Sequence, residues 1–346
     1  MKIVFVIPDM PGGGTERVVS LLANEYAKRN IETAVLMFAG NQVEYKLDEH
    51  IEVISVASAS DGSIRVVLRR IMNMRTYYKK NRNCHIFAFS TMGAVFSVIA
   101  AAGIPHTLLV SERSDPRKSP HRRWFEWAYA KADKVVLQTP DVLELFPKKI
   151  RKKAVIIPNP VDESIPARFT GHRRKVVTAV GRLERVKNYS LLIRAFRDFY
   201  QEFSDYQLHL YGIGELEQEL KLLAKTEKID HAVTFKGFSA NVKEEIRDAG
   251  MYVLSSDYEG ISNAMIEAIA MGVPTIATDC PIGGARMYIK EGVSGLLVPT
   301  GDRKRLADAM KRIASDRELA ETLSLGGVKI KEKYGLQEIA SRLLEE

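Results

Sequence analysis

The sequence predicts two doubly wound α/β domains joined by a stiff linker. Short apolar runs of strand length alternate with amphipathic stretches of helix length, as in parallel sheets covered by helices. The chain has 346 residues, which is long for a single hydrophobic core. The alternation is interrupted at IPNPVD, where Pro158 and Pro160 restrict the backbone. We therefore expect domains at residues 1–160 and 161–330 with a cleft between them, and a C-terminal helix at 331–346 that can return to the first domain.

The first domain is expected to begin with a buried strand at residues 2–7 and an amphipathic helix at 16–29, with three glycines between them. Continuous apolar runs of this length are typical of parallel strands, which are buried on both faces. Further strands are expected at the apolar runs 33–38, 84–89, 106–111 and 134–139.

The same alternation restarts after the linker with a strand near residues 174–180. Helices are expected at residues 188–203, 215–228 and 263–272. Strands are expected at residues 206–212, 232–237, 251–256, 274–279 and 295–299. No short-period repeat is visible, so a solenoid is not expected.

The composition is that of a folded globular protein, with 46% hydrophobic and 27% charged residues. The sequence contains no apolar stretch of about 18 residues, and its start does not resemble a cleavable signal, so we expect a soluble, non-exported protein. Cys84 and Cys280 lack metal-ligand spacing and fit a reducing cytoplasm.

The positive charge is concentrated in the first half of the chain. Residues 1–160 contain 24 Lys and Arg against 15 Asp and Glu, whereas the remainder contains 27 against 28. A pI of about 9.2 is also compatible with nucleic-acid binding. However, no recognition module and no interleaved aromatic pattern accompany it, so we do not expect nucleic acid as a partner.

Ligands of open α/β sheets bind outside the carboxyl ends of the strands, so the residues that follow each strand are the candidates for a site. Gly12, Gly13 and Gly14 follow the first strand and precede a helix, where they suit either an anion or a tight turn. In YGIGELEQEL, residues 211–220, the third glycine of a dinucleotide fingerprint would fall on Glu217, so a structural turn is favoured there.

Charged residues follow two other strands. Arg182 and Lys187 in AVGRLERVKN suit a diphosphate, although two cations after a strand are also common on surfaces. Glu112, Arg113 and Asp115 follow a strand of the first half, where the cleft and a solvated loop are equally compatible with them. The histidines show no ligand spacing, so no zinc site is expected.

The stretch EGISNAMIEAIAMGVP, residues 259–274, contains two carboxylates eight positions apart. Glu259 is expected on a loop and Glu267 on a helix that Ser262 or Asn263 caps. Eight helical residues span about 12 Å, too far for the carboxylate pair of a retaining glycosidase. We therefore expect different partners for them; for Glu267, a specific partner and a water-facing position both remain open.

The next strand is followed by Gly283 and Gly284 in a loop and by Arg286 at a helix start, again at a carboxyl edge. Cys280 lies in the same loop without a neighbouring histidine, so we expect a small buried thiol rather than a nucleophile.

Taken in order, these motifs resemble the retaining glycosyltransferases of family 4, whose GT-B architecture has two Rossmann-like domains facing a central cleft. The resemblance covers essentially the whole chain. It rests on the GGG-T-E-R loop, IPNPV, VGRLERVKN, YGIGE, FKGF, the E-x7-E of EGISNAMIEAIAMGVP, ATDCPIGGAR and GLLVPTGD.

The resemblance implies three catalytic residues. Arg182 and Lys187 would clamp the donor diphosphate, a role that a metal ion fills in other enzymes, and Glu259 would bind hydroxyls of the donor sugar. No metal and no cofactor are implied beyond the nucleotide-sugar donor, which is expected to be UDP-linked. The other implied donor-binding residues are Gly13, Gly14, Gly237, Phe238, Gly260, Ile261, Ser262, Asn263 and Glu267, with Glu267 on the ribose and Phe238 near the base.

The implied reaction passes a hexosyl or N-acetylhexosaminyl unit to a lipid-linked saccharide, with retention, in surface polysaccharide or glycan assembly. Many relatives have a cleft histidine where this sequence has SERSDP, which makes Arg113 a candidate, together with Glu16 and Arg286, on the acceptor or sugar side. A nucleotide-sugar 2-epimerase of the same architecture and a catalytically silent sugar-nucleotide binder are the alternatives.

The first domain of this family usually holds the acceptor, so its basic character suggests an anionic membrane as a partner. The helix expected at 63–80 mixes apolar and basic residues and can lie on the inner face of the cell membrane or pack on its own sheet with a solvated basic face. The residues are apolar Ile64, Val67, Leu68, Ile71 and Met74 and basic Arg65, Arg69, Arg70, Arg75, Lys79 and Lys80.

Overall fold

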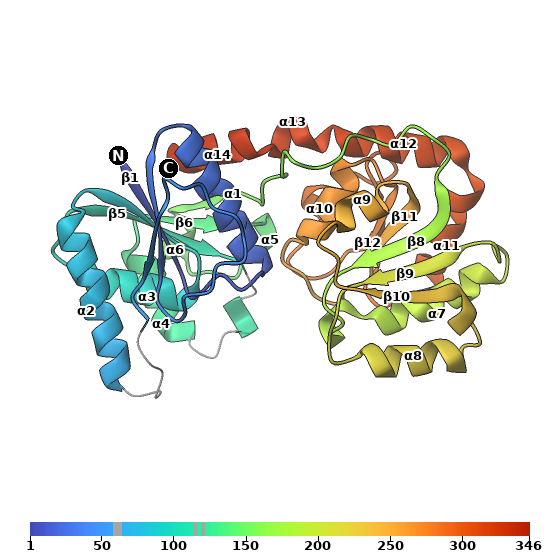
Figure 1. Ribbon diagram of the computed structural model, residues 1–346, viewed down its shortest axis with the longest axis horizontal. Coiled ribbons are helices and arrows are strands. Elements are labelled where there is room, and N and C mark those ends of the chain that lie inside the picture. The colour runs from blue at the N-terminus through green and yellow to red at the C-terminus, as the bar shows by residue number, and fades with distance from the viewer. Residues whose placement is uncertain (58–63, 114–115, 119–121) are drawn as a thin grey trace. The chain divides into compact units, whose positions relative to one another are not determined.

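The computed structural model describes residues 1–57, 64–113, 116–118 and 122–346 (Figure 1). The chain divides into two compact units. Unit 1 comprises Met1–Pro160 and Leu336–Glu346, and unit 2 comprises Val161–Gly335. Within the described residues, no helix combines the length and the apolar character that crossing a bilayer requires.

Unit 1 is built on a seven-stranded parallel sheet with the order β3-β2-β1-β4-β5-β6-β7. The strands are β1 (Lys2–Ile7), β2 (Glu32–Met37), β3 (Glu52–Ser55), β4 (Cys84–Ala88), β5 (His106–Glu112), β6 (Lys134–Leu137) and β7 (Ala154–Ile156). The helices are α1 (Gly14–Lys28), α2 (Ile64–Lys80), α3 (Thr91–Ala100), α4 (Arg122–Lys131), α5 (Pro140–Leu143), α6 (Lys148–Arg151) and α14 (Leu336–Leu344).

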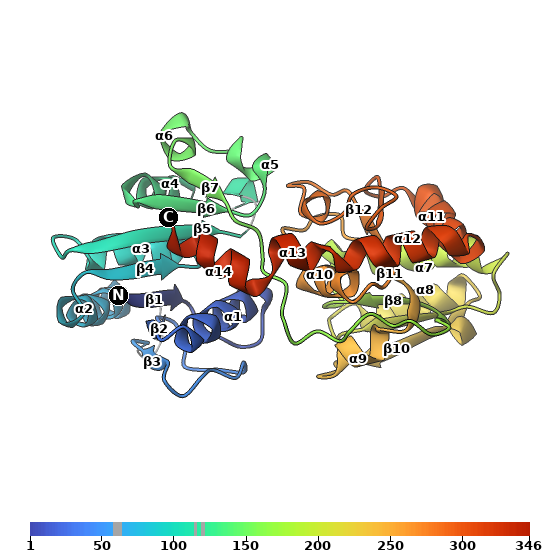
Figure 2. The same cartoon turned by 90° about the horizontal axis from the view of Figure 1, so that it is seen from above.

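The helices of unit 1 cover both faces of its sheet. The helix α3 contacts both α2 and α4, while α1 contacts α14 (Figure 2). Crossover connections are right-handed, so the reversal of strand order between β1 and β4 places α1 on one face and α2, α3 and α4 on the other.

The C-terminal residues form two helices rather than one. The helix α13 (Ile330–Tyr334) belongs to unit 2, Gly335 is extended, and α14 belongs to unit 1. The Tyr26 hydroxyl donates to the Ala340 carbonyl over 3.0 Å, and Arg342 donates to the Ile156 carbonyl over 2.9 Å. The single helix predicted at residues 331–346 was wrong because an extended residue interrupts the helical hydrogen bonds at Gly335.

Unit 2 is built on a six-stranded parallel sheet with the order β10-β9-β8-β11-β12-β13. The strands are β8 (Arg174–Val180), β9 (Gln207–Tyr211), β10 (Val233–Gly237), β11 (Ala249–Leu254), β12 (Thr275–Thr278) and β13 (Leu296–Val298). Besides α13, the helices are α7 (Tyr189–Tyr200), α8 (Glu217–Thr226), α9 (Val242–Ile246), α10 (Asn263–Ala270), α11 (Arg303–Ser315) and α12 (Arg317–Val328).

The predicted fold class, two doubly wound α/β domains, is confirmed. The apolar runs singled out in the sequence are strands, and β3 and β7 were missed. β3 lies at an edge, has no fully buried residue, and reads EVIS, whereas β7 has three residues. β3 lacks the continuous apolar run that marks a central parallel strand, and β7, although apolar, is shorter than the predicted strands.

Each sheet has a switch point where the strand order reverses, between β1 and β4 in unit 1 and between β8 and β11 in unit 2. Residues that follow these strands lie at the crevice where open α/β sheets bind ligands. In unit 2 these are the segments after Val180 and after Leu254.

An aromatic cluster packs in the core of unit 2 at the C-terminal end of α7. Phe199 is fully buried, its ring stacks on Phe203 with centroids 5.0 Å apart, and it meets the edge of Tyr206 at 5.1 Å. Such pairs add to the free energy gained by burial.

We expect Phe199→Ala to destabilise unit 2 by about 3–5 kcal/mol, because the surrounding side chains cannot fill the space of a phenyl ring. Differential scanning calorimetry should show a lowered transition for unit 2. Phe203→Ala is the control at a partly buried position, and an equal loss there would contradict the assigned role of Phe199.

Candidate functional site

The switch point of unit 2 holds an ion pair between two of the predicted site residues. Lys187 follows β8, Glu259 follows β11, and the Lys187 ammonium contacts Glu259 Oε2. The two side chains are only 17% and 20% exposed. Ser256 Oγ also donates to Glu259 Oε2 over 3.3 Å. The two charges therefore compensate each other in a partly dehydrated position.

The backbones of these two loops are bonded together. The Asp257 amide donates to the Val186 carbonyl over 3.0 Å, and Ser255 Oγ donates to the Lys187 carbonyl over 2.8 Å. These bonds fix the Lys187 and Glu259 backbones relative to each other, which preorganises the pair.

Asn188 adds a third link between the loops. Its backbone has φ 45° and ψ 48°, the left-handed conformation that asparagine tolerates better than most residues. Its Oδ1 accepts from the Leu191 amide over 3.0 Å and caps α7, while its Nδ2 donates to Asp257 Oδ1 over 2.7 Å. The start of α7 is thereby tied to the loop that carries Glu259.

The glycines of YGIG support the loop that carries Arg182. A Cβ atom on Gly212 would lie 2.0 Å from the Gly181 carbonyl oxygen, and one on Gly214 would lie 2.5 Å from the Leu183 carbonyl oxygen. The Leu183 amide donates to the Ile213 carbonyl over 3.0 Å. These glycines therefore allow close backbone packing, the structural role favoured in the sequence.

Arg182 does not join the ion pair in this structure. Its side chain is 79% exposed, and its Nη1 lies 2.9 Å from Glu184 Oε1 in the same loop. An exposed pair of this kind is weak, so the guanidinium can exchange Glu184 for another anion at little cost.

Glu267 does not face water. It lies on α10 with 5% of its surface exposed, which resolves the alternative left open by the sequence. Ser262, also buried, caps α10 by accepting from the Met265 amide over 3.4 Å. Asn263 begins the helix, and Ile261 precedes the cap as a buried side chain.

Tyr252 on β11 is a buried residue beside the candidate site that the sequence analysis missed. Its side chain is fully buried, and burial, reinforced by the nearby carboxylates of Glu259 and Glu267, raises the pKa of its hydroxyl. Both carboxylates therefore lie near one buried phenol. A tyrosine within an apolar strand carries no sequence signal that separates this position from the core.

The loop after β12 supports Glu259 and Gly260 from the other side. A Cβ atom on Gly284 would lie 1.5 Å from the Gly260 carbonyl oxygen, and Cys280 Sγ lies 4.0 Å from the Glu259 carbonyl oxygen. Burial raises the pKa of the Cys280 thiol to about 11, in keeping with the expected inert thiol. Arg286 Nε lies 2.6 Å from Asp279 Oδ1.

Gly237 and Phe238 lie at the end of β10. The Gly212 amide donates to the Gly237 carbonyl over 2.7 Å, so the FKGF segment is joined to the glycine loop after β9. Gly237 has φ 68°, a conformation that favours glycine. Phe238 is 78% exposed.

In unit 1 the glycine loop leads into α1, with Gly13 as its N-cap and Gly14 as its first residue. The Tyr45 hydroxyl donates to the Gly13 carbonyl over 3.0 Å. A Cβ atom on Gly13 would lie 2.1 Å from Glu16 Oε2, so the Glu16 carboxylate lies over the start of α1. A negative charge near the N-terminus of a helix is stabilised by the helix dipole.

Arg113 occupies the carboxyl edge of the unit 1 sheet. Its guanidinium lies 4.7 Å from the Phe89 ring centroid, and its Nη1 donates to Asn159 Oδ1 over 2.5 Å. Its amide donates to Glu112 Oε1 over 3.0 Å, and Glu112 Oε2 accepts from the Tyr129 hydroxyl. The arginine is thus held in place rather than placed on a solvated loop; Asp115 lies outside the described residues.

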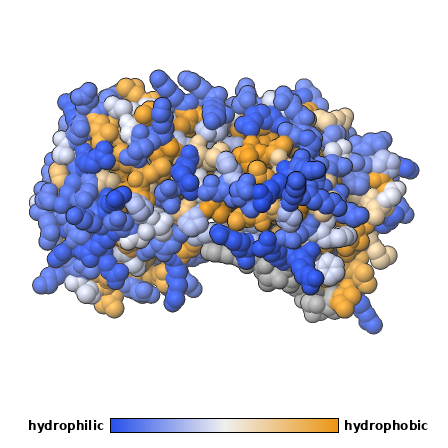
Figure 3. Space-filling model, turned by 180° about the vertical axis from the view of Figure 1, so that it is seen from behind, coloured by the Kyte–Doolittle hydropathy of each residue, from blue (hydrophilic) through white to orange (hydrophobic). Residues whose placement is uncertain are grey.

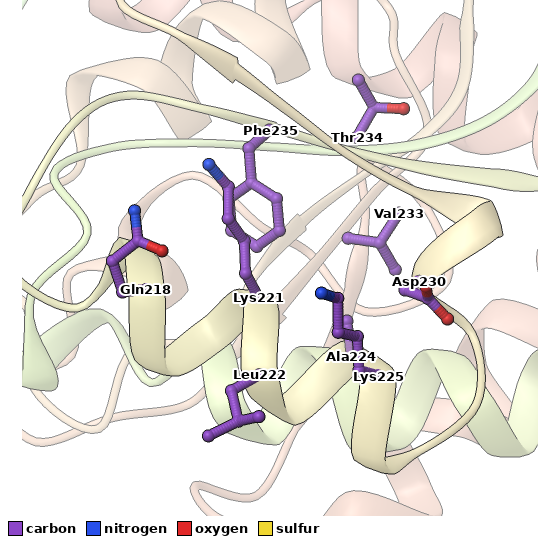
Figure 4. Close-up of a pocket in the computed structure, with 9 residues that line it drawn as sticks. All are labelled: Gln218, Lys221, Leu222, Ala224, Lys225, Asp230, Val233, Thr234 and Phe235. Carbon is purple, nitrogen blue, oxygen red and sulfur yellow. The ribbon is translucent and has the colours of Figure 1, made fainter.

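One cavity of about 570 Å³ lies between α8 and β10, away from the ion pair (Figure 4). Lys221 and Lys225 on α8 and Phe235 on β10 line it. Lys221 Nζ lies 5.5 Å from the Phe235 ring centroid. No predicted site residue lines this cavity. Among the residues that the structure describes, no group of three or more His, Cys, Asp or Glu side chains is arranged to hold a metal ion.

Family models match both halves of the chain. The model described as glycosyltransferase family 4 matches residues 12–165, and the model described as glycosyl transferases group 1 matches residues 161–327. The chain belongs to the glycosyltransferases of the family 4 type. The membership of family 4 that the motifs indicated is thereby confirmed.

Several curated glycosyltransferases are similar to this one over most of their length. An uncharacterized glycosyltransferase of Haemophilus influenzae is 23% identical over 98% of this chain and 97% of its own. A Campylobacter jejuni protein is 25% identical over 93% and 91%. It is named GalNAc-alpha-(1->4)-GalNAc-alpha-(1->3)-diNAcBac-PP-undecaprenol alpha-1,4-N-acetyl-D-galactosaminyltransferase.

Solved structures share the GT-B fold of this glycosyltransferase. Anabaena HepE in complex with UDP has a TM-score of 0.85 at 20% identity and covers 100% of this chain and 99% of its own. The lipopolysaccharide outer core galactosyltransferase WaaB has a TM-score of 0.77 at 19% identity and covers 99% and 98%. The predicted GT-B architecture of two Rossmann-like domains is thereby confirmed.

We expect Asn188→Ala to weaken UDP binding and to lower stability by about 1–2 kcal/mol, because it removes the cap of α7 and the link to Asp257. Isothermal titration with UDP and urea unfolding measure the two effects. Asp302→Ala is the matched control, since Asp302 caps α11 by accepting from the Arg305 amide over 2.9 Å. Equal UDP affinities for the two variants would contradict a positioning role for Asn188.

Proposed function

We propose that this glycosyltransferase moves a hexosyl or N-acetylhexosaminyl unit from a UDP-sugar to a lipid-linked saccharide, with retention of the anomeric configuration. The observation that carries the proposal is the Lys187–Glu259 pair at the switch point of unit 2. The HepE complex with UDP-glucose and the undecaprenol-linked substrate named for the Campylobacter relative support the donor and the acceptor.

The ion pair has the two chemical functions that a nucleotide sugar requires. A diphosphate needs a cation, and Lys187 supplies one; sugar hydroxyls need an acceptor of hydrogen bonds, and Glu259 supplies one. Binding of the donor would therefore divide the pair between the two parts of one ligand. Because each charge gains a new partner as it loses the old one, neither is left unpaired in a partly buried position.

The neighbouring residues would extend this donor site. Arg182 would exchange Glu184 for the diphosphate, and Glu267 would accept from the ribose hydroxyls. The backbone of the loop that begins α10 would contact the sugar and phosphate, since the N-terminus of a helix favours anions. The residues of that loop are Gly260, Ile261, Ser262 and Asn263, and Gly237 and Phe238 would lie near the base.

The proposed reaction needs no protein nucleophile. The bond from the anomeric carbon to the diphosphate oxygen breaks, and the acceptor hydroxyl attacks from the same face as the oxocarbenium character develops. The acceptor proton passes to the leaving phosphate oxygen, so UDP is released and the configuration is retained. Lys187 and Arg182 would stabilise the negative charge that grows on that oxygen.

Unit 1 would hold the acceptor, with Gly13 and Gly14 toward the diphosphate. Arg113 is proposed on the acceptor or sugar side, where its fixed guanidinium could donate to hydroxyl or phosphate oxygens. Glu16 and Arg286 remain candidates for the same role. The protein would act at the inner face of the cell membrane, where a lipid-linked acceptor presents its head group, in surface polysaccharide or glycan assembly.

The alternative is a nucleotide-sugar 2-epimerase of the same architecture. Such an enzyme needs acid and base groups at C2 of the sugar but no second substrate. The excess of basic residues in the first half of the chain favours an enzyme with an anionic or lipid-linked acceptor.

The decisive experiment incubates the protein with a panel of UDP-sugars and measures UDP release with and without lipid-diphosphate saccharides. Acceptor-dependent UDP release is expected with one donor, and nuclear magnetic resonance of the product gives the anomeric configuration. Conversion of a UDP-sugar at C2 without acceptor would establish the epimerase instead, and the absence of binding or turnover with every donor would refute the proposal.

Glu259→Ala and Lys187→Ala are each expected to abolish transfer while the fold remains intact, because each removes a donor contact and leaves the other charge without its partner. Initial rates and a thermal melt measure the two properties. Lys175→Ala is the control, since Lys175 forms an exposed pair with Asp205 at the opposite end of β8. A near-normal rate for either site variant would refute its assigned role.

Transfer is expected to continue in the presence of excess EDTA, since Arg182 and Lys187 are proposed to neutralise the diphosphate in place of a metal ion. Rates measured after dialysis against EDTA and after readdition of Mg²⁺ or Mn²⁺ test this. A rate that falls with EDTA and recovers with either ion would contradict the proposed roles of the two cations.

A further inference from the structure

The helix α2 exposes an apolar stripe that the fold of unit 1 does not use. Ile64, Leu68 and Met72 recur every four residues and are 78%, 54% and 66% exposed. A spacing of four places them on one side of the helix. A stripe of this kind on a helix already packed on its domain is unusual for a surface exposed only to water.

A second side of α2, adjacent to this stripe, packs on α3. Met74 is fully buried, the Tyr78 hydroxyl lies 3.2 Å from Ser97 Oγ, and Arg75 donates to the Ala100 and Ala102 carbonyls. Met74 and Arg75, two of the residues listed for this helix in the sequence analysis, therefore contact the rest of unit 1. The 3.6-residue period defines a stripe, but it does not say which of two apolar stripes faces the sheet.

The helix α4 exposes both tryptophans of the chain. Trp124 and Trp127 are 64% and 39% exposed and, with Arg123, line a hollow of about 390 Å³. Phe125 and Tyr129, on the other side of α4, are buried. Tryptophan combines an apolar ring with a polar N–H, which suits the interface between a bilayer and water.

The helices that carry these apolar side chains begin at one edge of unit 1. The helices α2, α3 and α4 follow parallel strands, so all three begin at the carboxyl edge of the sheet, and α3 contacts both of the others. Met92, in the first turn of α3, is 37% exposed. This edge also carries Arg113 and the glycine loop. In the view of Figure 1, the first residues of α2 are at the lower end of that helix.

Basic side chains accompany the apolar ones. Arg65 and Arg69 on α2 and Arg123 on α4 are exposed. Figure 3 shows apolar patches among hydrophilic residues on the molecular face seen from behind. An anionic bilayer matches both properties, since it offers apolar depth and negative head groups. A soluble polyanion matches only the arginines, and a glycan stacked on aromatic rings matches only the tryptophans.

We propose that unit 1 docks on an anionic bilayer through this edge, which we call the docking edge. It consists of Ile64, Leu68, Met72, Met92, Trp124 and Trp127 with the arginines around them. The inference rests on the proposed lipid-linked acceptor and adds the surface that meets the lipid. Docking at this edge places the carboxyl ends of the unit 1 strands beside the head groups, where Arg113 can reach the acceptor.

The test uses the emission of the native protein, because the chain has two tryptophans and both lie on the docking edge. Vesicles of phosphatidylcholine with phosphatidylglycerol are expected to shift the emission to shorter wavelength, and lipids brominated near the head group are expected to quench it. Binding should weaken as salt rises. Vesicle binding with unchanged emission would overturn the docking edge while leaving membrane association intact.

Variants identify the contributions of the two helices. The double variant Trp124→Ser, Trp127→Ser and the double variant Ile64→Ser, Leu68→Ser are each expected to weaken sedimentation with anionic vesicles by about tenfold, since each removes two apolar anchors. Leu222→Ser is the control in unit 2, where Leu222 is 66% exposed, as Met72 is. Equal losses in the control and the double variants would refute a specific edge.

Activity separates this inference from the proposed function. With an acceptor bearing a short, soluble lipid, the double variants are expected to keep the native rate, whereas with the acceptor in vesicles their rates should fall about tenfold. Equal loss in both formats would overturn the docking role. A tryptophan emission shift with soluble oligosaccharide and none with vesicles would show that the edge binds glycan instead.

Discussion

The candidate donor site depends on the junction of two loops at the switch point of the unit 2 sheet. The loops after β8 and β11 run from neighbouring strands, which is why Lys187 and Glu259 meet although they are 72 positions apart in the chain. The backbone bonds from Asp257 to Val186 and from Ser255 to Lys187 fix this junction before any ligand binds. The attraction in a partly buried charge pair is largely offset by the cost of removing both charges from water, so the backbone bonds are what make its geometry definite.

Much of the surrounding sequence serves this junction without contacting a ligand. Gly212 and Gly214 let the turn after β9 press against the Arg182 loop, and Gly284 lets the turn after β12 press against Gly260. The loops after β8, β9, β11 and β12 are therefore stacked backbone against backbone. A side chain at any of these glycines would have to move main-chain atoms, which have few alternative positions. The glycines of this family motif are thus better explained by loop packing than by direct contact with phosphate.

The sequence was a good guide to the fold because a buried parallel strand needs a continuous apolar run, and those runs are legible. It failed where this requirement is relaxed, at the exposed edge strand β3 and the short β7, and at Gly335, where an extended residue divides the C-terminal helices. It assigned Lys187 and Glu259 to one site through a resemblance, since spacing alone gives no contact between distant loops. Tyr252 was missed because a buried tyrosine beside a site has the same local sequence as one in the core.

The two sides of α2 show the limit of pattern reasoning most clearly. Val66, Met74 and Tyr78 form one apolar stripe, and Ile64, Leu68 and Met72 form another. A single period of 3.6 residues fits either stripe, so the sequence could not decide which one the sheet would bury. Tyr78 explains which stripe is buried, since its large ring packs against α3 and its hydroxyl forms a hydrogen bond with Ser97. The stripe of Ile64, Leu68 and Met72 is then left exposed on the surface of unit 1. An apolar surface that folding does not bury is available for contact with a bilayer.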